Sequence, residues 1–204
     1  IIEELQLENK YVSEYNKLKS GAMIEFQGKE YNLPQMQKFM VSSDREVRRL
    51  ANKATWDFYE NHDKEFGDIY DKLVKVRTKM AQKLGYENFV PLAYKRMQRL
   101  DYTAKEISKY RLELKKYLVP LAEKYRLKQM ERIGIKDPHF YDYSINFIDG
   151  NPVPNGDTET LTNEAERMYH EMNEDIGQRF TYLKEHGHLD LEARKGKQGG
   201  GYEA

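Results

Sequence analysis

The sequence contains no cysteine, which excludes disulfide bonds and thiolate chemistry. It also has no net charge, because 34 basic residues balance 34 acidic ones. A neutral chain lacks the broad positive field that attracts nucleic acid or anionic lipid, so we expect neither partner. No apolar run approaches the roughly 20 residues of a membrane-spanning helix, and no signal peptide is visible. These absences favour a cytoplasmic protein with no membrane partner.

Apolar residues are scarce as well. With tyrosine left out and glycine counted in, they make up about 37% of the chain, against roughly 45–50% in a typical soluble domain. The mean hydropathy is −0.92, so much of the chain must lie on solvated faces around a thin core. The chain starts with Ile1-Ile2-Glu3-Glu4-Leu5, which reads as the interior of a helix without an initiating Met. We therefore expect a chain that is cut at its start.

Helical periodicity is what the sequence does contain. Ser43 and Glu46 are spaced as a capping box, in which each side chain binds the backbone amide of the other residue. A helix with one buried face is predicted beyond this box from Val47, Leu50, Ala51, Ala54 and Phe58. A second helix is predicted from Phe66, Ile69, Leu73, Met80 and Leu84. Gly85 is expected to end it in a left-handed turn.

A shorter helical piece is expected from Glu87 to Gln98. Thr103 and Glu106 form a second predicted capping box, which opens the longest element, running to Gly134. Pro120 removes a backbone donor inside it, so a kink is expected nearby. The apolar stripe of this helix is predicted to be core, so that Leu114→Ala and Leu121→Ala should each cost about 2–5 kcal/mol. The stripe consists of Ile107, Tyr110, Leu114, Tyr117, Leu118, Leu121 and Tyr125.

A sequence pattern typical of β-strands occurs at residues 22–31, where it predicts a small hairpin with Gln27-Gly28 at its turn. Residues 135–157 are dense in turn formers, which predicts a loop-rich crossover between helical layers. Helix is expected again from about Thr160, with a break near Glu174 and an end at Gly187. The predicted fold class is therefore mostly α.

The stretch His170-Glu171-Met172-Asn173-Glu174 differs by one letter from the HExxH zinc motif. That motif needs two imidazoles one helical turn apart, and Glu174 occupies the second position. His186 and His188 flank a helix-ending glycine, so their side chains are not expected to converge. We interpret the stretch as an ordinary amphipathic helix. Met168, Tyr169 and Met172 should face inward, and His170, Glu171 and Glu174 should face water.

The end of the chain is rich in glycine, with Gly199, Gly200 and Gly201 before Tyr202. Glycines of this kind let a backbone come close to another chain, for example a peptide that lies alongside as an added strand. A loose tail or a linker explains the same composition, and these interpretations stay open at this point.

At this segment the sequence resembles a known family. Asp190 to Lys197, followed by Gly200-Gly201-Tyr202, is similar to the signature before the zinc-binding helix of oligoendopeptidase F, of the thimet-oligopeptidase family of zinc metallopeptidases. Other residues resemble the family in the same order along the chain: Ser43–Arg49, Gly85–Phe89, Tyr94, Arg96-Met97, Arg99, Asp101-Tyr102-Thr103, Val119–Leu121 and Tyr141-Asp142. Gly199 and Glu203 depart from the pattern, where Pro or Ser and Cys are commoner.

The resemblance implies a mostly α-helical lobe of a larger zinc peptidase that cuts short unfolded peptides in a deep channel. The zinc ligands and the catalytic glutamate would follow Ala204, so this chain should hold no catalytic metal, be inactive alone and supply scaffold and channel wall. Gly200, Gly201 and Tyr202 are the candidate substrate-binding residues. Short peptides and the remainder of the same polypeptide are the expected partners.

The same resemblance divides the chain into a truncated helical lobe, 1–134, and a segment, 135–204, that holds the crossover loop and the start of the catalytic region. A stand-alone helical interaction module, offering a groove to a partner helix or peptide, is the alternative to a peptidase fragment.

Overall fold

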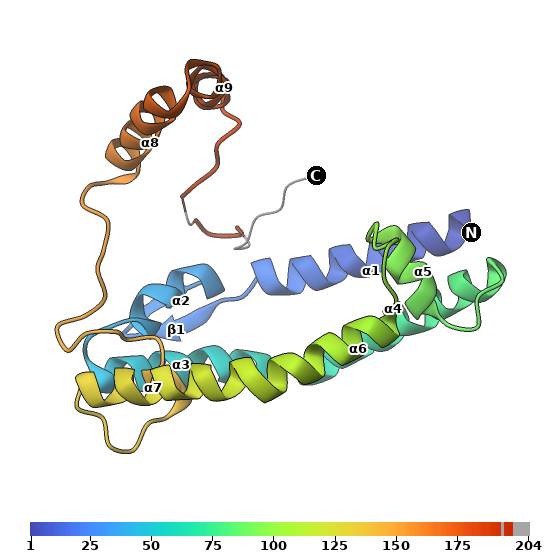
Figure 1. The fold of residues 1–204 in the computed structure, drawn as a ribbon, viewed down its shortest axis with the longest axis horizontal. Coiled ribbons are helices and arrows are strands. Elements are labelled where there is room, and N and C mark those ends of the chain that lie inside the picture. The colour runs from blue at the N-terminus through green and yellow to red at the C-terminus, as the bar shows by residue number, and fades with distance from the viewer. Residues whose placement is uncertain (193, 198–204) are drawn as a thin grey trace. The chain divides into compact units, whose positions relative to one another are not determined.

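The computed structural model describes residues 1–192 and 194–197 (Figure 1). Within them, the regular elements are helices apart from one two-stranded sheet, which confirms the predicted mostly α fold. The contacts divide the described residues into two compact units, Ile1–Gly150 with residues 195–197, and a second unit within Asn151–Arg194. No described helix is long and apolar enough to cross a membrane.

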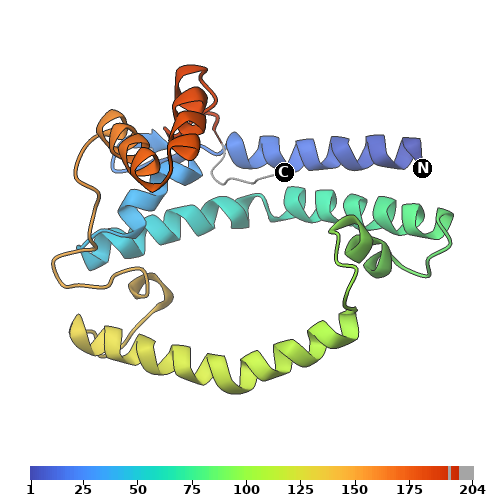
Figure 2. The same cartoon turned by 45° about the horizontal axis from the view of Figure 1, so that its top comes forward.

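The first helix pair of the larger unit is held together by charge. Helix α1 (Ile2–Ser20) lies antiparallel to α4 (Asp63–Lys83), as Figure 2 shows. The buried residues of α1 are Glu4 and Glu8, which are 1% and 4% exposed. Their cationic partners come from α4 and from α5 (Phe89–Arg96): Lys79 and Lys83 with Glu4, and Arg77 and Arg96 with Glu8. The residues that α1 buries are therefore charged, whereas those that α4 buries are apolar: Ile69, Val76, Met80 and Ala81.

The Glu4 ion pairs predict an acid-sensitive contact between α1 and α4. Hydrogen bonds from Lys83 and Lys79 lower the pKa of Glu4 from 4.5 to about 2. A carboxylate with a lowered pKa stabilises the fold above its unfolded pKa, and this contribution is lost as the pH falls through the folded value. The free energy of unfolding should therefore be higher for the unmodified protein than for Glu4→Gln at pH 6. The two values should converge as the pH falls from about 4.5 to 2.

Glu3→Gln is the matched control on the same helical turn, because Glu3 is exposed. It should follow the unmodified protein at every pH. If the difference in unfolding free energy between the unmodified protein and Glu4→Gln stayed constant down to pH 2, the stabilising role of the Glu4 ion pairs would be contradicted.

The main apolar core lies where the predicted hairpin meets two helices. Strands β1 (Ile24–Phe26) and β2 (Lys29–Tyr31) pair antiparallel, with Ile24 opposite Tyr31. Gln27 and Gly28 have φ of +50° and +74°, the two positive values that a type I′ turn requires. The hairpin packs with α2 (Leu33–Met40) and α3 (Arg45–Asn61) around Ala22, Ile24, Phe26, Met36, Ala51 and Phe58. The predicted hairpin is thus confirmed.

Helix α3 begins one residue later than predicted. Asp44 is its N-cap, and Asp44 Oδ1 accepts hydrogen bonds from the amides of Glu46 and Val47. Glu46 pairs with Arg49 at 2.6 Å. The predicted Ser43–Glu46 capping box is therefore wrong, because the Asp44 carboxylate caps the same amides and also interacts with the positive end of the helix dipole.

Four helices end in the same turn, in which two amides bond back to the last carbonyls. Gly85, Gly134 and Gly187 take the left-handed position after α4, α7 (Val119–Arg132) and α9 (Glu174–Glu185), with φ of +81°, +72° and +67°. The predicted roles of Gly85 and Gly187 as helix-ending residues are confirmed. Gln98 takes this position after α5, with φ +55°. A side chain there costs roughly 1–2 kcal/mol relative to a right-handed conformation.

The longest predicted helix is continuous but irregular. It consists of α6 (Ala104–Glu113), a π-helical turn (Leu114–Leu118) and α7 (Val119–Arg132). Glu106 Oε2 accepts from the Thr103 amide at 2.7 Å, which confirms the second capping box. The predicted kink near Pro120 takes the form of the π-helical turn, and Figure 2 shows the rod bending near its middle.

The stripe along this rod is not core, so that prediction is wrong. Five of its seven residues are 46–63% exposed: Tyr110, Tyr117, Leu118, Leu121 and Tyr125. Figure 2 shows α6 and α7 standing apart from α3 and α4 along their middle. Helical spacing identifies an apolar face, but it does not say what covers that face.

The far end of α7 is fixed by polar contacts. The side-chain amide of Gln129 donates to the carbonyls of Tyr143 and Ile145, and Arg132 Nε donates to the carbonyl of Asn146. These bonds tie the rod to the loop that leads back to α3.

The smaller unit is a helical hairpin of α8 (Thr158–Met172) and α9 (Glu174–Glu185). Asn173 separates them, and its side chain caps α9 by accepting from the amides of Asp175 and Ile176. The predicted break therefore lies one residue before Glu174. A Cβ at Gly177 would lie 2.7 Å from His170 Cα, so the close packing of the two helices requires glycine there.

Candidate functional site

His170, the first residue of the zinc-like stretch, is engaged on both sides of its ring. Its Nδ1 lies 3.1 Å from Glu174 Oε2, and its Nε2 lies 3.1 Å from Thr181 Oγ1 on α9. Thr181 donates in turn to Glu166, which also pairs with Lys184. Lys184 and Thr181 lower the pKa of Glu166, and His170 lowers the pKa of Glu174. This network leaves no ring nitrogen of His170 available to a metal.

The predicted orientation of this helix is right for Glu171 and Glu174, whose side chains are exposed, and wrong for His170, Met168 and Met172. His170 is half-buried against α9, whereas Met168 and Met172 are 52% and 71% exposed. Tyr169 does pack, stacked on Phe180 with ring centroids 4.7 Å apart. The reason is Gly177, which brings α9 against the His170 side of α8. Within residues 1–192 and 194–197, no group of three His, Asp or Glu side chains is arranged to hold a metal ion.

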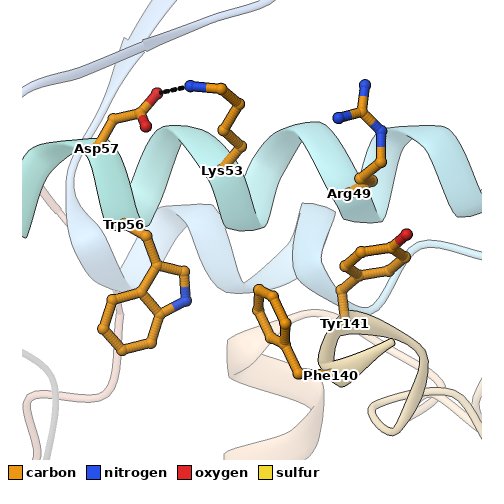
Figure 3. A pocket seen from close by; sticks show the side chains of 6 residues that line it. All are labelled: Arg49, Lys53, Trp56, Asp57, Phe140 and Tyr141. Carbon is orange, nitrogen blue, oxygen red and sulfur yellow. Dashed lines mark hydrogen bonds and ion pairs between the residues drawn. The ribbon is translucent and has the colours of Figure 1, made fainter. Parts of the chain in front are cut away.

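The larger unit carries an apolar hollow of about 630 Å³ on the side of α3. The rings of Trp56 and Phe140 lie on the same side of α3 (Figure 3), and these residues are 56% and 59% exposed. Tyr141 borders it beside Arg49, and Lys53 pairs with Asp57 at 2.5 Å on the same helix. The volume is within the range of small-molecule and side-chain sites. We call these six residues, Arg49, Lys53, Trp56, Asp57, Phe140 and Tyr141, the α3 hollow.

A buried carboxylate positions the far wall of the α3 hollow. Phe140 and Tyr141 lie on a 3₁₀ turn (Phe140–Asp142), and the side chain of Asp142 is fully buried. Asp142 accepts from Arg45 Nε at 3.0 Å, from Arg48 at 3.1 Å and from the His139 amide at 2.9 Å. Burial raises the pKa of Asp142, but these hydrogen bonds outweigh it and the net direction is downward. The loop is thus fastened to the first turns of α3.

The chemistry of the α3 hollow is that of binding. Two large aromatic faces suit an apolar side chain, and the charges at its border are neutralised by neighbours one turn away on the helix. No histidine or unpaired carboxylate lies among its six lining residues, so it offers no general base.

The sequence analysis missed Trp56, Phe140 and Tyr141 as a group. Trp56 lies outside the apolar stripe that α3 buries. Its position off that stripe was the one feature of the sequence that could have indicated a binding surface. Phe140 lies 84 residues further along the chain and no local pattern connects the two. The candidate substrate residues Gly200, Gly201 and Tyr202 lie outside the described residues.

Comparison with known proteins gives a consistent result. The family model of peptidase family M3 matches residues 38–204. A structure of PZ peptidase A with an inhibitor is 46% identical, with a TM-score of 0.95 over 98% of this chain. Two structures assigned as oligoendopeptidase F, one of them from Bacillus anthracis, are 44% and 41% identical, with TM-scores of 0.94 and 0.92 over 97% and 98% of this chain.

The chain spans 35–37% of the length of these three solved proteins. No curated protein sequence matches it.

Proposed function

Because this chain belongs to peptidase family M3, we propose that it forms part of a zinc-dependent oligoendopeptidase. Such an enzyme hydrolyses internal bonds of short unfolded peptides. The observation that carries the proposal is the agreement of sequence and fold with PZ peptidase A, at 46% identity and a TM-score of 0.95. The comparisons give no support to the alternative of a stand-alone interaction module.

The proposed contribution of this chain is scaffold and channel wall. The segment with Gly200, Gly201 and Tyr202 is proposed to border the substrate, because glycine allows a peptide backbone to approach closely. The α3 hollow offers a second surface that suits an apolar side chain. A reducing cytoplasm is the proposed compartment, which the lack of cysteine supports.

The zinc that this family implies does not fit the described residues. His170 uses both ring nitrogens within the α8–α9 hairpin, and Glu171 pairs with Arg167. A zinc site needs three or four ligands that converge on one point. The metal ligands are therefore proposed to lie in sequence beyond this chain.

The test compares the 204-residue chain with a longer polypeptide that continues it through an HExxH segment. The longer protein should cleave a short, internally quenched peptide, and a chelator should abolish this activity. The chain alone should give no cleavage above the blank. The matched control is the longer protein with the glutamate of that motif replaced by glutamine. Absence of cleavage by the longer protein would overturn the proposed activity, and equal cleavage by the chain alone would overturn the location of the metal site.

A further inference from the structure

A second hollow, of about 430 Å³, lies between α5 and the start of α6. Its apolar part includes Val90, Leu100 and Tyr102, which are 50%, 73% and 39% exposed. The rings of Tyr94 and Tyr102 meet edge to face at 6.3 Å and form one wall. Concave apolar surfaces of this volume are typical of ligand sites. We call this surface the α5–α6 hollow.

The charged residues that line the α5–α6 hollow are all basic: Lys95, Arg99 and Lys105. None of the three forms an ion pair with any residue that the structure describes. The neighbouring Arg96, by contrast, pairs with the buried Glu8 at 3.0 Å. The lining of the α5–α6 hollow therefore carries three positive charges and no negative one.

Aromatic rings hold two of these cations at the border. The Lys95 ammonium lies 5.2 Å from the centre of the Tyr86 ring, and the Arg99 guanidinium lies 5.6 Å from the centre of the Tyr94 ring. Cation–π contacts orient a positive group without neutralising its charge. Lys95 and Arg99 therefore keep their charge available to an anionic ligand.

The turn that leads into the α5–α6 hollow has a left-handed residue that is not glycine. Gln98 has φ +55° in the turn that reverses the chain after α5, and the Arg99 amide bonds to the Tyr94 carbonyl at 2.9 Å. The turns after α4, α7 and α9 have glycine at the same position. This turn carries Arg99, Leu100 and Tyr102 back alongside α5. The turn thereby sets the position of these three lining residues.

We propose that the α5–α6 hollow binds a short acidic peptide segment that carries a bulky apolar side chain. The apolar side chain would fill the hollow beside Leu100 and Tyr94, and carboxylates on either side of it would pair with Lys95, Arg99 and Lys105. The occupant follows from charge complementarity: a lining with three cations and no carboxylate favours an anionic ligand.

A peptide fits better than the other polyanions. Nucleic acid and anionic membranes are bound through extended positive surfaces, and this chain is neutral overall. A concave site for one apolar side chain with few charges at its border is the pattern of peptide recognition. The proposal does not rest on peptide hydrolysis, because it concerns binding by residues that this chain already contains.

Fluorescence anisotropy of a labelled peptide, titrated with the 204-residue chain, tests the proposal. The probe is a short peptide with a central phenylalanine between aspartates. Two matched peptides replace the phenylalanine by alanine or the aspartates by asparagines. Each replacement should weaken binding at least about tenfold, and added salt should weaken binding of the acidic probe.

Variants of the protein locate the site. Lys95→Gln combined with Arg99→Gln should weaken binding at least about tenfold, and Leu100→Ala should weaken it several-fold. These side chains are exposed, so the fold should persist, which circular dichroism checks. Lys109→Gln is the matched control, because Lys109 is exposed on α6 outside the lining. It should leave the affinity unchanged.

Four results would overturn the proposal. The first is equal affinity for the acidic and the asparagine peptide, and the second is unchanged affinity in the double variant. Saturable binding of anionic vesicles or single-stranded DNA that the acidic peptide does not displace would assign the hollow to another ligand. Concentration-dependent dimerisation that Leu100→Ala abolishes would assign it to a second copy of the chain.

Discussion

Asp142→Asn is expected to lower the free energy of unfolding of the larger unit by about 3–5 kcal/mol. The Arg48 side chain is 2% exposed, and Asp142 is the carboxylate that it pairs with. The other bonds of its guanidinium go to the carbonyls of Ser42 and Ser43, which do not neutralise its charge. Removing the negative charge therefore leaves a buried cation uncompensated, which is the costly way to break an ion pair.

Chemical denaturation followed by circular dichroism measures the loss, and Trp56 reports on the loop. Trp56 is the one tryptophan in the sequence and lies beside Phe140, so its emission should change when the 3₁₀ turn is released. Asp149→Asn, at an exposed position of the same loop, is the control and should change stability little. Equal stability of the two variants would contradict the assigned role of Asp142.

A double variant tests whether the loss of stability comes from the unpaired charge of Arg48. Arg48→Met combined with Asp142→Asn should recover part of the loss, because no buried charge remains unpaired, while Arg45 stays solvated. The advantage of the unmodified protein over Asp142→Asn should disappear in acid. The pKa of Asp142 is lowered, so its contribution is present above the ordinary carboxyl range and is lost as the pH falls below it.

Met36→Ala is the second change with a large expected effect, about 2–5 kcal/mol of unfolding free energy. Met36 is 0% exposed and lies among the β1–β2 hairpin, α2 and α3. Truncation there removes buried contacts and leaves a cavity. Denaturant titration gives the free energy of unfolding of each protein. An unchanged dependence of this free energy on denaturant concentration would show that unfolding is equally cooperative in both.

Leu121→Ala is the matched comparison, and here the structure reverses the expectation from sequence. Leu121 is 46% exposed, so its truncation should change the stability of this chain by no more than about 0.5 kcal/mol. A loss at Leu121 as large as that at Met36 would show that the α6–α7 stripe is covered by something in solution.

Local signals in the sequence predicted local structure well. Thr103 and Glu106 cap α6, Gly85 ends α4, and the Gln27-Gly28 turn joins two short strands. Each of these features depends on residues within one or two turns of chain. The one-residue error at the start of α3 is of the same kind, because Ser43 and Asp44 compete for the same amides and the carboxylate wins.

Contacts between distant residues could not be predicted in this way. Asp142 lies 94 residues from Arg48, and Glu8 lies 88 residues from Arg96. In a chain with 34 acidic and 34 basic residues, many pairings are equally compatible with the sequence. The two hollows depend on such pairings or on strained turns, which explains why their residues were not identified.

The π-helical turn at Leu114–Leu118 sets the phase between the two halves of the long rod. Thr103 fixes the rotation of α6 at one end, and the bonds of Gln129 to the following loop fix that of α7 at the other. With 3.6 residues per turn, loss of one residue between them would rotate α7 by about 100° about its axis. Gln129 would then point away from its carbonyl partners. The number of residues in this segment, more than their identity, should therefore be under selection.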